Sequence, residues 1–581
     1  MAVFARAKGA ALRFSGETER LCRFTEQVQL LDASLWPLLE QQFVLRPDSP
    51  DRRWRGEFWG KLLRGGALLY EYTGDPALYD TLEASVRRML KTRDARGVFS
   101  TYAPDCELSG WDLWCRKYVL LGMEYFLEIC RDEALKQEIL TALRGHLDAV
   151  LEQVGPGKTN ITATSHRWLG VNSCSILEPV IWLYRLTGER RYLDFAAYIV
   201  STGGVSEGGD LLTLALDGVP PCEFPEQKAY ETMSFFEGVL EYGREVGDER
   251  CLQAAEAFAR SIMATDVTVI GCCGCKSEQF DRSAVRQSDP TNLSIMQETC
   301  VTVTWMRLCW RLFFHTGDKV FLDQMERSAQ NALYGTVNTE RRPGFAFDSY
   351  SPLTLYRRGR KVGGLLTLGG SERSFGCCTA NGAFGVAIAA LAAVAQREDG
   401  PCLCFYRPGT VTVSTPAGGR LTLEISLSQT AAAQTVTLRM DCPEETFSLY
   451  LRIPDWAGSA HAEGAVEENG WLVLKKAWHA GDTVVLTLTT PVQILRQNGM
   501  VSLRHGPHVL ARDARTGEAV EAPVRLTEPV VPIPAEAPFP AEKCFRIPTA
   551  DGFITLCDYA SCGKTWDDAS RTAAWFMEES L

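Results

Sequence analysis

The sequence has no excess of positive charge and no long apolar run. Its 581 residues include 60 lysines and arginines against 72 aspartates and glutamates, for a formal net charge of −12. An acidic chain without a basic stripe argues against nucleic acid or an anionic membrane surface as a partner, and it fits a neutral or cationic small substrate better. No window approaches the roughly 18 uninterrupted apolar residues of a membrane-spanning helix, so we expect no membrane partner.

A sustained apolar segment is also missing from the first residues, MAVFARAKGAALRFSG. Secretory signal peptides require such a segment, so we expect a cytoplasmic protein. In a reducing compartment the 20 cysteines should be mostly thiols. Most of them should fill core space, and where they cluster, metal ligation or catalysis is favoured over disulfides.

Low-complexity tracts are absent, and the length predicts two to four domains. The first two thirds of the chain repeats one pattern, in which an amphipathic helix, a short turn and a second helix follow one another. The turns fall at Gly74, Asp132, Gly188 and Gly247, which are 58, 56 and 59 residues apart, and Gly317 follows after 70 residues. Glycine at such turns is typical of helix C-caps. The longer last step predicts an insertion.

A helical hairpin cannot bury its apolar face alone, so repeats of this period must stack or close. With the apolar stretch at 382–396 as a final helix, about six hairpins are available. We therefore predict a multidomain α+β protein in which residues 25–395 form an (α/α)6 toroid. An open solenoid is the alternative.

After Gly400 the pattern changes to short alternating runs separated by turn signals, which are typical of strands. This predicts an antiparallel β-sandwich over residues 396–495 and a further C-terminal β region over residues 496–581. Residues 1–24 are expected to form an N-terminal β arm. The strand-like strings ALRFSG and VQLLD near the start are expected to pack back onto the sandwich.

Cysteines and a glutamate form the first candidate site. Glu298 and Cys300 precede an amphipathic helix, and Cys377 and Cys378 stand where a polar run gives way to an Ala-rich helix. Three thiols and a carboxylate make a plausible tetrahedral zinc set. The alternative is a group of buried thiols beside an exposed glutamate.

A second cysteine group, Cys272, Cys273 and Cys275, falls in the widened gap between two repeats. It is a rival metal cluster. Its Gly and Cys content also suits a tight buried loop, and we favour that interpretation. Glu278, three residues further on, is a candidate proton donor.

Four segments between the predicted helices combine aromatic and polar residues, at 54–61, 110–118, 165–172 and 222–236. Toroids place their sites at one mouth, which such segments line. Tryptophan and tyrosine faces with carboxylate and amide edges suit sugar rings, although each aromatic residue alone is more often part of the core. The candidate sugar contacts are Trp111, His166, Trp168, Asn172, Glu226 and Tyr230.

The strings Glu298-Thr-Cys300 and Cys377-Cys378-Thr-Ala-Asn381, with SLYLRIPDWAG (448–458) and GWLVLKKAWHAGDTVVLTLTTPVQ (470–493), resemble glycoside hydrolase family 127. This family contains the bacterial β-L-arabinofuranosidases and their relatives. The similarity spans nearly the whole chain, and the domain order of the family matches the order predicted above.

The resemblance implies a retaining mechanism in which a zinc-bound cysteine is the nucleophile. Zinc would be held by Glu298, Cys300, Cys377 and Cys378. Cys377 would attack the anomeric carbon, and Glu278 would act first as general acid and then as general base. The expected substrates are small glycosides or oligosaccharides that end in a pentofuranose, with β-L-arabinofuranose as the default sugar.

Two departures from the family limit this expectation. Phe375 and Thr379 flank the cysteine pair where the family usually has Cys and Pro, and the chain has only seven histidines. Trp168, Ser175 and Lys228, or their neighbours, stand where characterised relatives line the sugar pocket with histidines. Another furanose or a modified pentose is therefore an option.

Other functional classes stay open. One alternative is a non-catalytic carbohydrate-binding protein with a structural zinc. Another is a sugar lyase or epimerase on the same toroid, with Tyr230 or His166 as base. The sandwich could mediate a homodimer.

Overall fold

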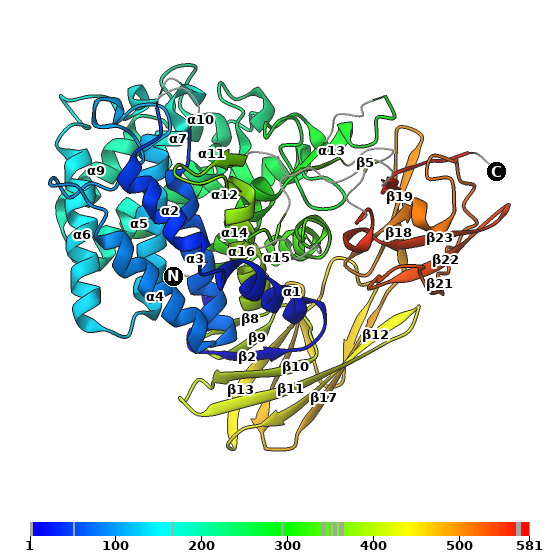
Figure 1. The fold of residues 1–581 in the computed structure, drawn as a ribbon. Coiled ribbons are helices and arrows are strands. Elements are labelled where there is room, and N and C mark those ends of the chain that lie inside the picture. The colour runs from blue at the N-terminus through cyan, green and yellow to red at the C-terminus, as the bar shows by residue number, and fades with distance from the viewer. Residues whose placement is uncertain are drawn as a thin grey trace.

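The computed structural model (Figure 1) describes residues 4–49, 53–165, 167–291, 296–338, 344–347, 350–352, 357–358, 365–564 and 571–579. Helices dominate the chain up to Leu391, and strands dominate after it. The helical body runs from blue to green in Figure 1. One β region lies beneath it and another lies beside it near the C-terminus.

Six helices of the described chain form an inner ring. They are α3 (Gly56–Thr73), α5 (Asp112–Ile129), α8 (Leu177–Thr187), α11 (Ala229–Val246), α14 (Thr299–Thr316) and α16 (Cys377–Leu391). Each contacts the next, and α16 contacts α3, so the ring is closed. The prediction of a toroid is therefore confirmed over the open solenoid.

The outer helices follow the inner ones along the chain. They are α4 (Pro76–Leu90), α6 (Glu133–Leu151), α9 (Arg190–Ser201), α12 (Glu249–Thr265) and α15 (Val320–Arg327), which continues as the π-helical η6 (Ser328–Leu333). The outer partner of α16 comes from the other end of the chain, because α1 (Glu17–Thr25) packs against it. Residues 17–24, which we expected in the β arm, are therefore helical.

The string VQLLD was wrongly predicted as a strand. Residues Glu26–Leu30 form the π-helix η1, which continues α1. Its Gln29 Nε2 donates a hydrogen bond to the carbonyl oxygen of Thr379, at 2.7 Å. An apolar run this short fits a buried helix turn as well as a strand, and its contact with α16 decides between them.

The predicted turns are confirmed. Gly74, Gly188, Gly247 and Gly317 end four of the inner helices with φ of 63°, 69°, 73° and 74°. Only glycine adopts this left-handed conformation without steric cost. Asp132 instead caps the start of α6, where its side chain accepts hydrogen bonds from two backbone N–H groups of the first turn.

Two glycines let α3 and α5 approach until their backbones touch. A Cβ on Gly60 would lie 1.8 Å from the carbonyl oxygen of Tyr118. A Cβ on Gly122 would lie 2.8 Å from the Cα of Gly60. This approach places Lys61 of α3 beside the ring of Tyr118, which becomes important at the site.

The β-sandwich consists of two six-stranded sheets. The first has the order β1 (Ala5–Arg6), β8 (Val394–Arg397), β9 (Gly400–Leu403), β13 (Glu445–Arg452), β16 (Trp471–Trp478) and β15 (Val466–Glu468). The second has the order β14 (Ala460–Ala462), β17 (Thr483–Thr489), β12 (Ala433–Asp441), β11 (Arg420–Gln429), β10 (Gly409–Ser414) and β2 (Ala11–Phe14). Because β2 pairs with β10, the string ALRF does pack onto the sandwich, as predicted.

A third sheet forms the C-terminal region. Its order is β18 (Val492–Gln497), β19 (Met500–His505), β20 (His508–Asp513), β23 (Gly552–Asp558), β22 (Cys544–Thr549) and β21 (Ile533–Pro534), with β24 (Arg571–Ala573) and β25 (Phe576–Met577) beside it. Strand β24 also pairs with β5 (Arg357–Arg358), which belongs to the segment between α15 and α16. None of the helices in the described part of the chain has both the length and the apolar character that crossing a bilayer requires.

Candidate metal centre and active site

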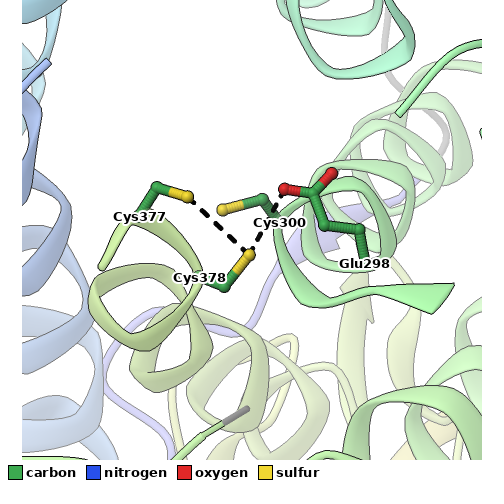
Figure 2. Close-up of side chains that lie close together, drawn as sticks. All are labelled: Glu298, Cys300, Cys377 and Cys378. Carbon is green, nitrogen blue, oxygen red and sulfur yellow. Dashed lines mark hydrogen bonds between the residues drawn. The ribbon is translucent and has the colours of Figure 1, made fainter. Parts of the chain in front are cut away.

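Four side chains, hereafter the Cys–Glu cluster, converge in Figure 2: Glu298, Cys300, Cys377 and Cys378. Their ligand atoms all lie within 4.8 Å of one another. The Sγ of Cys378 is 3.3 Å from Oε1 of Glu298 and 3.9 Å from Sγ of Cys377. Sulfur ligands about 2.3 Å from a tetrahedral zinc ion are about 3.8 Å apart, so the donor set fits zinc in spacing and chemistry.

Two helix starts and one strand end position the cluster. Cys377 and Cys378 are the first two residues of α16, and Cys300 is the second residue of α14. Glu298 ends β3 (Met296–Glu298), which pairs with β4 (Tyr350–Pro352). A helix N-terminus carries a partial positive charge, and this favours thiolate over thiol.

The residues that flank the cysteine pair, where the chain departs from the family pattern, serve packing. The buried ring of Phe375 stands edge-on to Phe58 at 5.7 Å. Thr379 Oγ1 donates to the carbonyl oxygen of Phe347 at 3.2 Å. With these two residues in place, both thiols still lie within 4.8 Å of the ligand atoms of Glu298 and Cys300.

The three thiols differ in the direction of their pKa shifts. Hydrogen bonding with Cys300 and Cys378 lowers the pKa of Cys377 well below its usual value. Burial raises the pKa of Cys300 and of Cys378 well above it. Cys377 is also the partly exposed member of the set, while the other two thiols are buried. It is the thiol best suited to react.

A cavity of about 200 Å³ lies over Cys377. Glu298 also lines it, whereas Cys300 and Cys378 lie behind its wall. Pockets for drug-sized ligands hold about 300–1,000 Å³. This cavity therefore suits a single sugar residue.

All four of the predicted aromatic segments contribute to the cavity wall. The lining residues are Trp54, Glu57, Lys61, Trp111, Trp114, Arg167, Trp168, Lys228, Tyr230, Glu231, Glu278, Glu298 and Cys377. They come mainly from the first turns of the inner helices and from the loops that precede them. The site thus lies at the mouth of the ring where the inner helices begin.

Aromatic rings form one continuous side of the cavity. The ring centroids of Trp54 and Trp111 are 6.2 Å apart, those of Trp111 and Trp114 are 5.7 Å apart, and those of Trp114 and Tyr230 are 5.0 Å apart. All three pairs meet edge to face, the arrangement that aromatic quadrupoles favour. Such a rigid apolar wall can hold one face of a sugar ring.

A buried lysine, Lys61, also lines the cavity, next to these rings. Lys61 Nζ is 2.9 Å from Glu57 Oε1, 3.9 Å from Cys300 Sγ and 4.6 Å from the centre of the Tyr230 ring. Burial acts to lower the pKa of Lys61, but Cys300 and Glu57 raise it well above its usual value. Burial raises the pKa of Glu57 to about 7. These two neighbours therefore favour the protonated form of Lys61 beside the cluster.

Glu278 also lines the cavity and forms an ion pair with Lys228. Its backbone carbonyl accepts a hydrogen bond from Ala229 N at 2.8 Å, which ties it to the start of α11. Lys228 Nζ in turn lies 5.0 Å from the centre of the Trp168 ring. Glu278 and Trp168 both have positive φ, 68° and 56°, a costly conformation that is frequent at functional sites.

The predicted sugar contacts divide into three groups. Trp111, Trp168 and Tyr230 line the cavity. Asn172 and Glu226 do not, because their side chains bind backbone: Asn172 Nδ2 donates to the carbonyl oxygen of Gly110 at 3.0 Å, and Glu226 Oε1 accepts from Lys228 N at 2.8 Å. His166 lies outside the described residues.

Several lining residues were not singled out from the sequence: Trp54, Glu57, Lys61, Trp114, Arg167 and Glu231. Their spacing was the available signal, since Glu57 and Lys61 are four apart and Trp111 and Trp114 are three apart. Residues at these spacings share one face of a helix. Which face of each helix points into the ring depends on how the helices pack, and the spacing alone does not determine this.

The rival cysteine group forms no metal site. The Sγ atoms of Cys272 and Cys275 are 3.7 Å apart, and Cys273 packs into a different apolar core. Within the described residues, the Cys–Glu cluster is the one group of three or more ligand-type side chains that can hold an ion. The favoured interpretation of residues 272–275, a tight buried loop, is confirmed.

Comparison with known proteins now decides the family. A family model described as the GH127 catalytic domain of β-L-arabinofuranosidase matches residues 17–390. The model of the GH127 middle domain matches residues 405–490. The chain belongs to glycoside hydrolase family 127. The catalytic match begins at the first residue of α1, in agreement with the role of that helix in the ring.

The relatives are distant in sequence. A non-reducing end β-L-arabinofuranosidase of Bifidobacterium longum subsp. longum is 22% identical over 414 residues, which cover 64% of this chain and 61% of the relative. The chain thus matches less than two thirds of that relative's length. A structure described as a GH127 β-arabinofuranosidase superposes with a TM-score of 0.76 and 16% identity, covering 100% of this chain and 98% of the other. The structure of a GH127 β-L-arabinofuranosidase from Geobacillus stearothermophilus T6 superposes with a TM-score of 0.75 and 16% identity, covering 98% of this chain and 100% of the other. Both share the fold.

Proposed function

We propose that this GH127 member is a retaining glycoside hydrolase with a zinc-bound cysteine nucleophile and a glutamate acid/base. Its proposed substrates are small glycosides or oligosaccharides, from which it releases a terminal pentofuranose, by default β-L-arabinofuranose. One observation carries the proposal: Cys377 is the thiol of the Cys–Glu cluster that lines the cavity. A cytoplasmic location and a homodimer stay predictions.

The donor set of the cluster supports zinc as the cofactor. Glu298, Cys300, Cys377 and Cys378 would hold the ion, and three thiolates with one carboxylate exceed its charge by two. When bound, zinc keeps the thiols deprotonated at neutral pH. Lys61, 3.9 Å from Cys300 Sγ, offsets part of the excess negative charge.

The residues around the cavity can carry out a two-step displacement. In the first step Cys377 Sγ forms a bond to the anomeric carbon, while the bond to the leaving oxygen breaks and that oxygen takes a proton from Glu278. In the second step Glu278 takes a proton from water, whose oxygen replaces the sulfur at the anomeric carbon. Two inversions give net retention. The ion pair with Lys228 holds the Glu278 carboxyl group at the cavity wall, where it can exchange the proton in both steps.

The other functional classes lose support at particular residues. A lyase or epimerase needs a base, but burial raises the pKa of Tyr230 well above its usual value and its hydroxyl is hydrogen-bonded to Tyr118. A purely structural zinc site would enclose all four ligands. Here one sulfur faces a cavity of sugar size.

The test is a screen of aryl furanosides and pyranosides under reducing conditions, with zinc content measured on the same sample. Wild-type protein should hydrolyse an aryl β-L-arabinofuranoside. Cys377→Ser should reduce kcat at least about a thousandfold, because the loss of a nucleophile removes most of the catalytic effect. Cys106→Ser, at a cysteine outside the cavity, is the matched control and should behave as wild type. Normal turnover by Cys377→Ser would refute the proposal.

A further inference from the structure

Three polar groups in the cavity wall have no hydrogen-bond partner among the described residues. Glu231, in the first turn of α11, is 2% exposed, and its Oε2 is buried without a hydrogen bond to any described residue. The indole N–H groups of Trp54 and Trp168 are likewise buried without an acceptor in the described chain. All three residues line the cavity over Cys377. An unpaired buried polar group costs free energy. We therefore expect a bound ligand to supply the missing hydrogen-bond partners.

The chemistry of the expected ligand follows from the kinds of open hydrogen-bonding groups in the cavity wall. One open acceptor and two open donors suit hydroxyl groups, which both donate and accept. Four carboxylates and three cationic side chains line the space, so the wall offers no excess of positive charge to a negatively charged ligand: Glu57, Glu231, Glu278 and Glu298 stand beside Lys61, Arg167 and Lys228. A positively charged ligand would find two aromatic faces already taken, since Lys61 lies 4.6 Å from Tyr230 and Lys228 lies 5.0 Å from Trp168. The wall therefore selects a neutral polyhydroxylated ring.

The position of Glu231 links recognition to the reaction. Lys228 is the N-cap residue of α11 and Glu231 is the third residue of that helix. Burial raises the pKa of Glu231 and the charge of Lys228 acts to lower it, so the two side chains lie near each other. Lys228 is the ion-pair partner of Glu278. A hydroxyl held by Glu231 would therefore fix how the sugar is turned toward Glu278 on one side and Cys377 on the other.

We propose that Glu231 determines sugar specificity by accepting a hydrogen bond from one hydroxyl of the sugar bound over Cys377. The indole N–H groups of Trp54 and Trp168 donate to neighbouring hydroxyls. This inference rests on the proposed function, because it assumes that the sugar ring lies over the nucleophile. Its substrate class is a neutral pentose unit whose ring hydroxyls are free.

The test uses 4-nitrophenyl β-L-arabinofuranoside and its 2-, 3- and 5-deoxy analogues. With wild-type protein, kcat/KM should fall about 10- to 150-fold for one of the three analogues, which is the range for a hydrogen bond to a charged group. In Glu231→Gln the fall in kcat/KM for that same analogue, relative to the parent glycoside, should shrink to a few-fold. The falls for the other two analogues should be the same as in wild type. Glu245→Gln, on the same helix but at a partly exposed ion pair with Arg185, is the matched control and should repeat the wild-type pattern.

A second variant keeps the test independent of how Glu231→Gln folds. Trp168→Phe retains an aromatic ring but lacks the N–H group. It should weaken the discrimination at a different hydroxyl, by about 2- to 13-fold, as expected for a neutral hydrogen bond. Binding of the intact glycoside to Cys377→Ser, measured by calorimetry with and without Glu231→Gln, separates the effect on binding from the effect on turnover.

The outcomes distinguish the two proposals. Equal kcat/KM for all the deoxy analogues in wild type would overturn the role of Glu231, and so would a uniform loss across all analogues in Glu231→Gln. If wild-type protein binds zinc but leaves the parent glycoside intact, the proposed sugar is wrong, and the assignment of Glu231 falls with it.

Discussion

Two groups of three cysteines occupy buried parts of this molecule, and they differ in their surroundings. In the sealed loop, residues 272–275, two thiols lie 3.7 Å apart against the C-terminal β region, and the third faces another core. In the Cys–Glu cluster a carboxylate joins the three thiols, two helices begin there, and one sulfur reaches a cavity.

The difference teaches that closeness of thiols is not enough for chemistry. Burial raises the pKa of Cys273 well above its usual value, and the hydrogen bond with Cys272 does the same for Cys275. Both shifts favour the thiol form, so Cys273 and Cys275 act as small apolar residues. At Cys377 the hydrogen bonds of the neighbouring thiols act in the opposite direction.

The largest effect should come from removing ligands on one side of the comparison only. The double variant Cys300→Ser, Cys378→Ser should lose nearly all zinc and all measurable turnover, because two of the four donors are gone. The matched double variant Cys272→Ala, Cys275→Ala should keep about one zinc per chain and the wild-type rate. Metal analysis and an aryl glycoside assay on the same samples measure both. Loss of zinc from the second variant would contradict the prediction that only the Cys–Glu cluster binds the ion.

Glu278 lies only three residues after the sealed loop, in the same widened gap between two helical repeats. A variant of Glu278 therefore tests whether this gap also contributes a residue to the reaction. Glu278→Ala should slow glycosides with poor leaving groups by about 10²- to 10⁴-fold, the usual contribution of general acid catalysis. The 4-nitrophenolate leaving group needs little protonation in the first step. The glycosylation rate of a 4-nitrophenyl glycoside should therefore fall much less in Glu278→Ala. Equal losses in glycosylation rate for both substrates would argue against the acid role.

Alkylation compares the thiols directly. In zinc-free protein, iodoacetamide should modify Cys377 first, and its rate should stay nearly constant as the pH falls from 8 to 6.5, because its pKa is lowered. An ordinary thiol loses about tenfold in thiolate for each pH unit below its pKa. Cys272 and Cys275 should react only on unfolding. Mass spectrometry of peptides reads out each site, and early modification of the sealed loop would contradict the contrast.

The smallest effect concerns strand β20, whose Val509 and Ala511 pack with the sealed loop. Burial lowers the pKa of the neighbouring His508 to about 4. The unfolded chain, with an ordinary histidine pKa near 6.5, takes up a proton first as the pH falls, so acid destabilises the folded state. Between pH 7 and 5 this should cost about 2 kcal/mol. His508→Gln should reduce that slope in chemical unfolding monitored at both pH values; an unchanged slope would rule out His508 as its source.

The sequence predicted the repeat well because its signals are local. Gly74, Gly188, Gly247 and Gly317 end their helices as expected, and each turn is determined by residues near it in the chain. The role of α1 was missed for the opposite reason. Its partner α16 begins at Cys377, some 350 residues later, and no local pattern indicates that pairing.

The site was predicted to the level of segments but not always of residues. All four aromatic segments line the cavity, yet Glu226 was chosen where Glu231 lies at the wall. Glu226 precedes α11 and binds the backbone of Lys228, while Glu231 lies within the first helical turn. The rotation of α11 about its axis decides between them. That rotation is set by packing against neighbouring helices, which a single sequence does not reveal.

The closure of the ring also has a consequence for how the protein is made. Helix α3 leaves the ribosome more than 300 residues before α16, its neighbour in the ring and the carrier of Cys377. At about 5–20 residues per second, the early helices wait for tens of seconds with their inner faces open. Cys377, the proposed nucleophile, has not been synthesised during that wait, and a message cut short before residue 377 would yield a helical fragment without it.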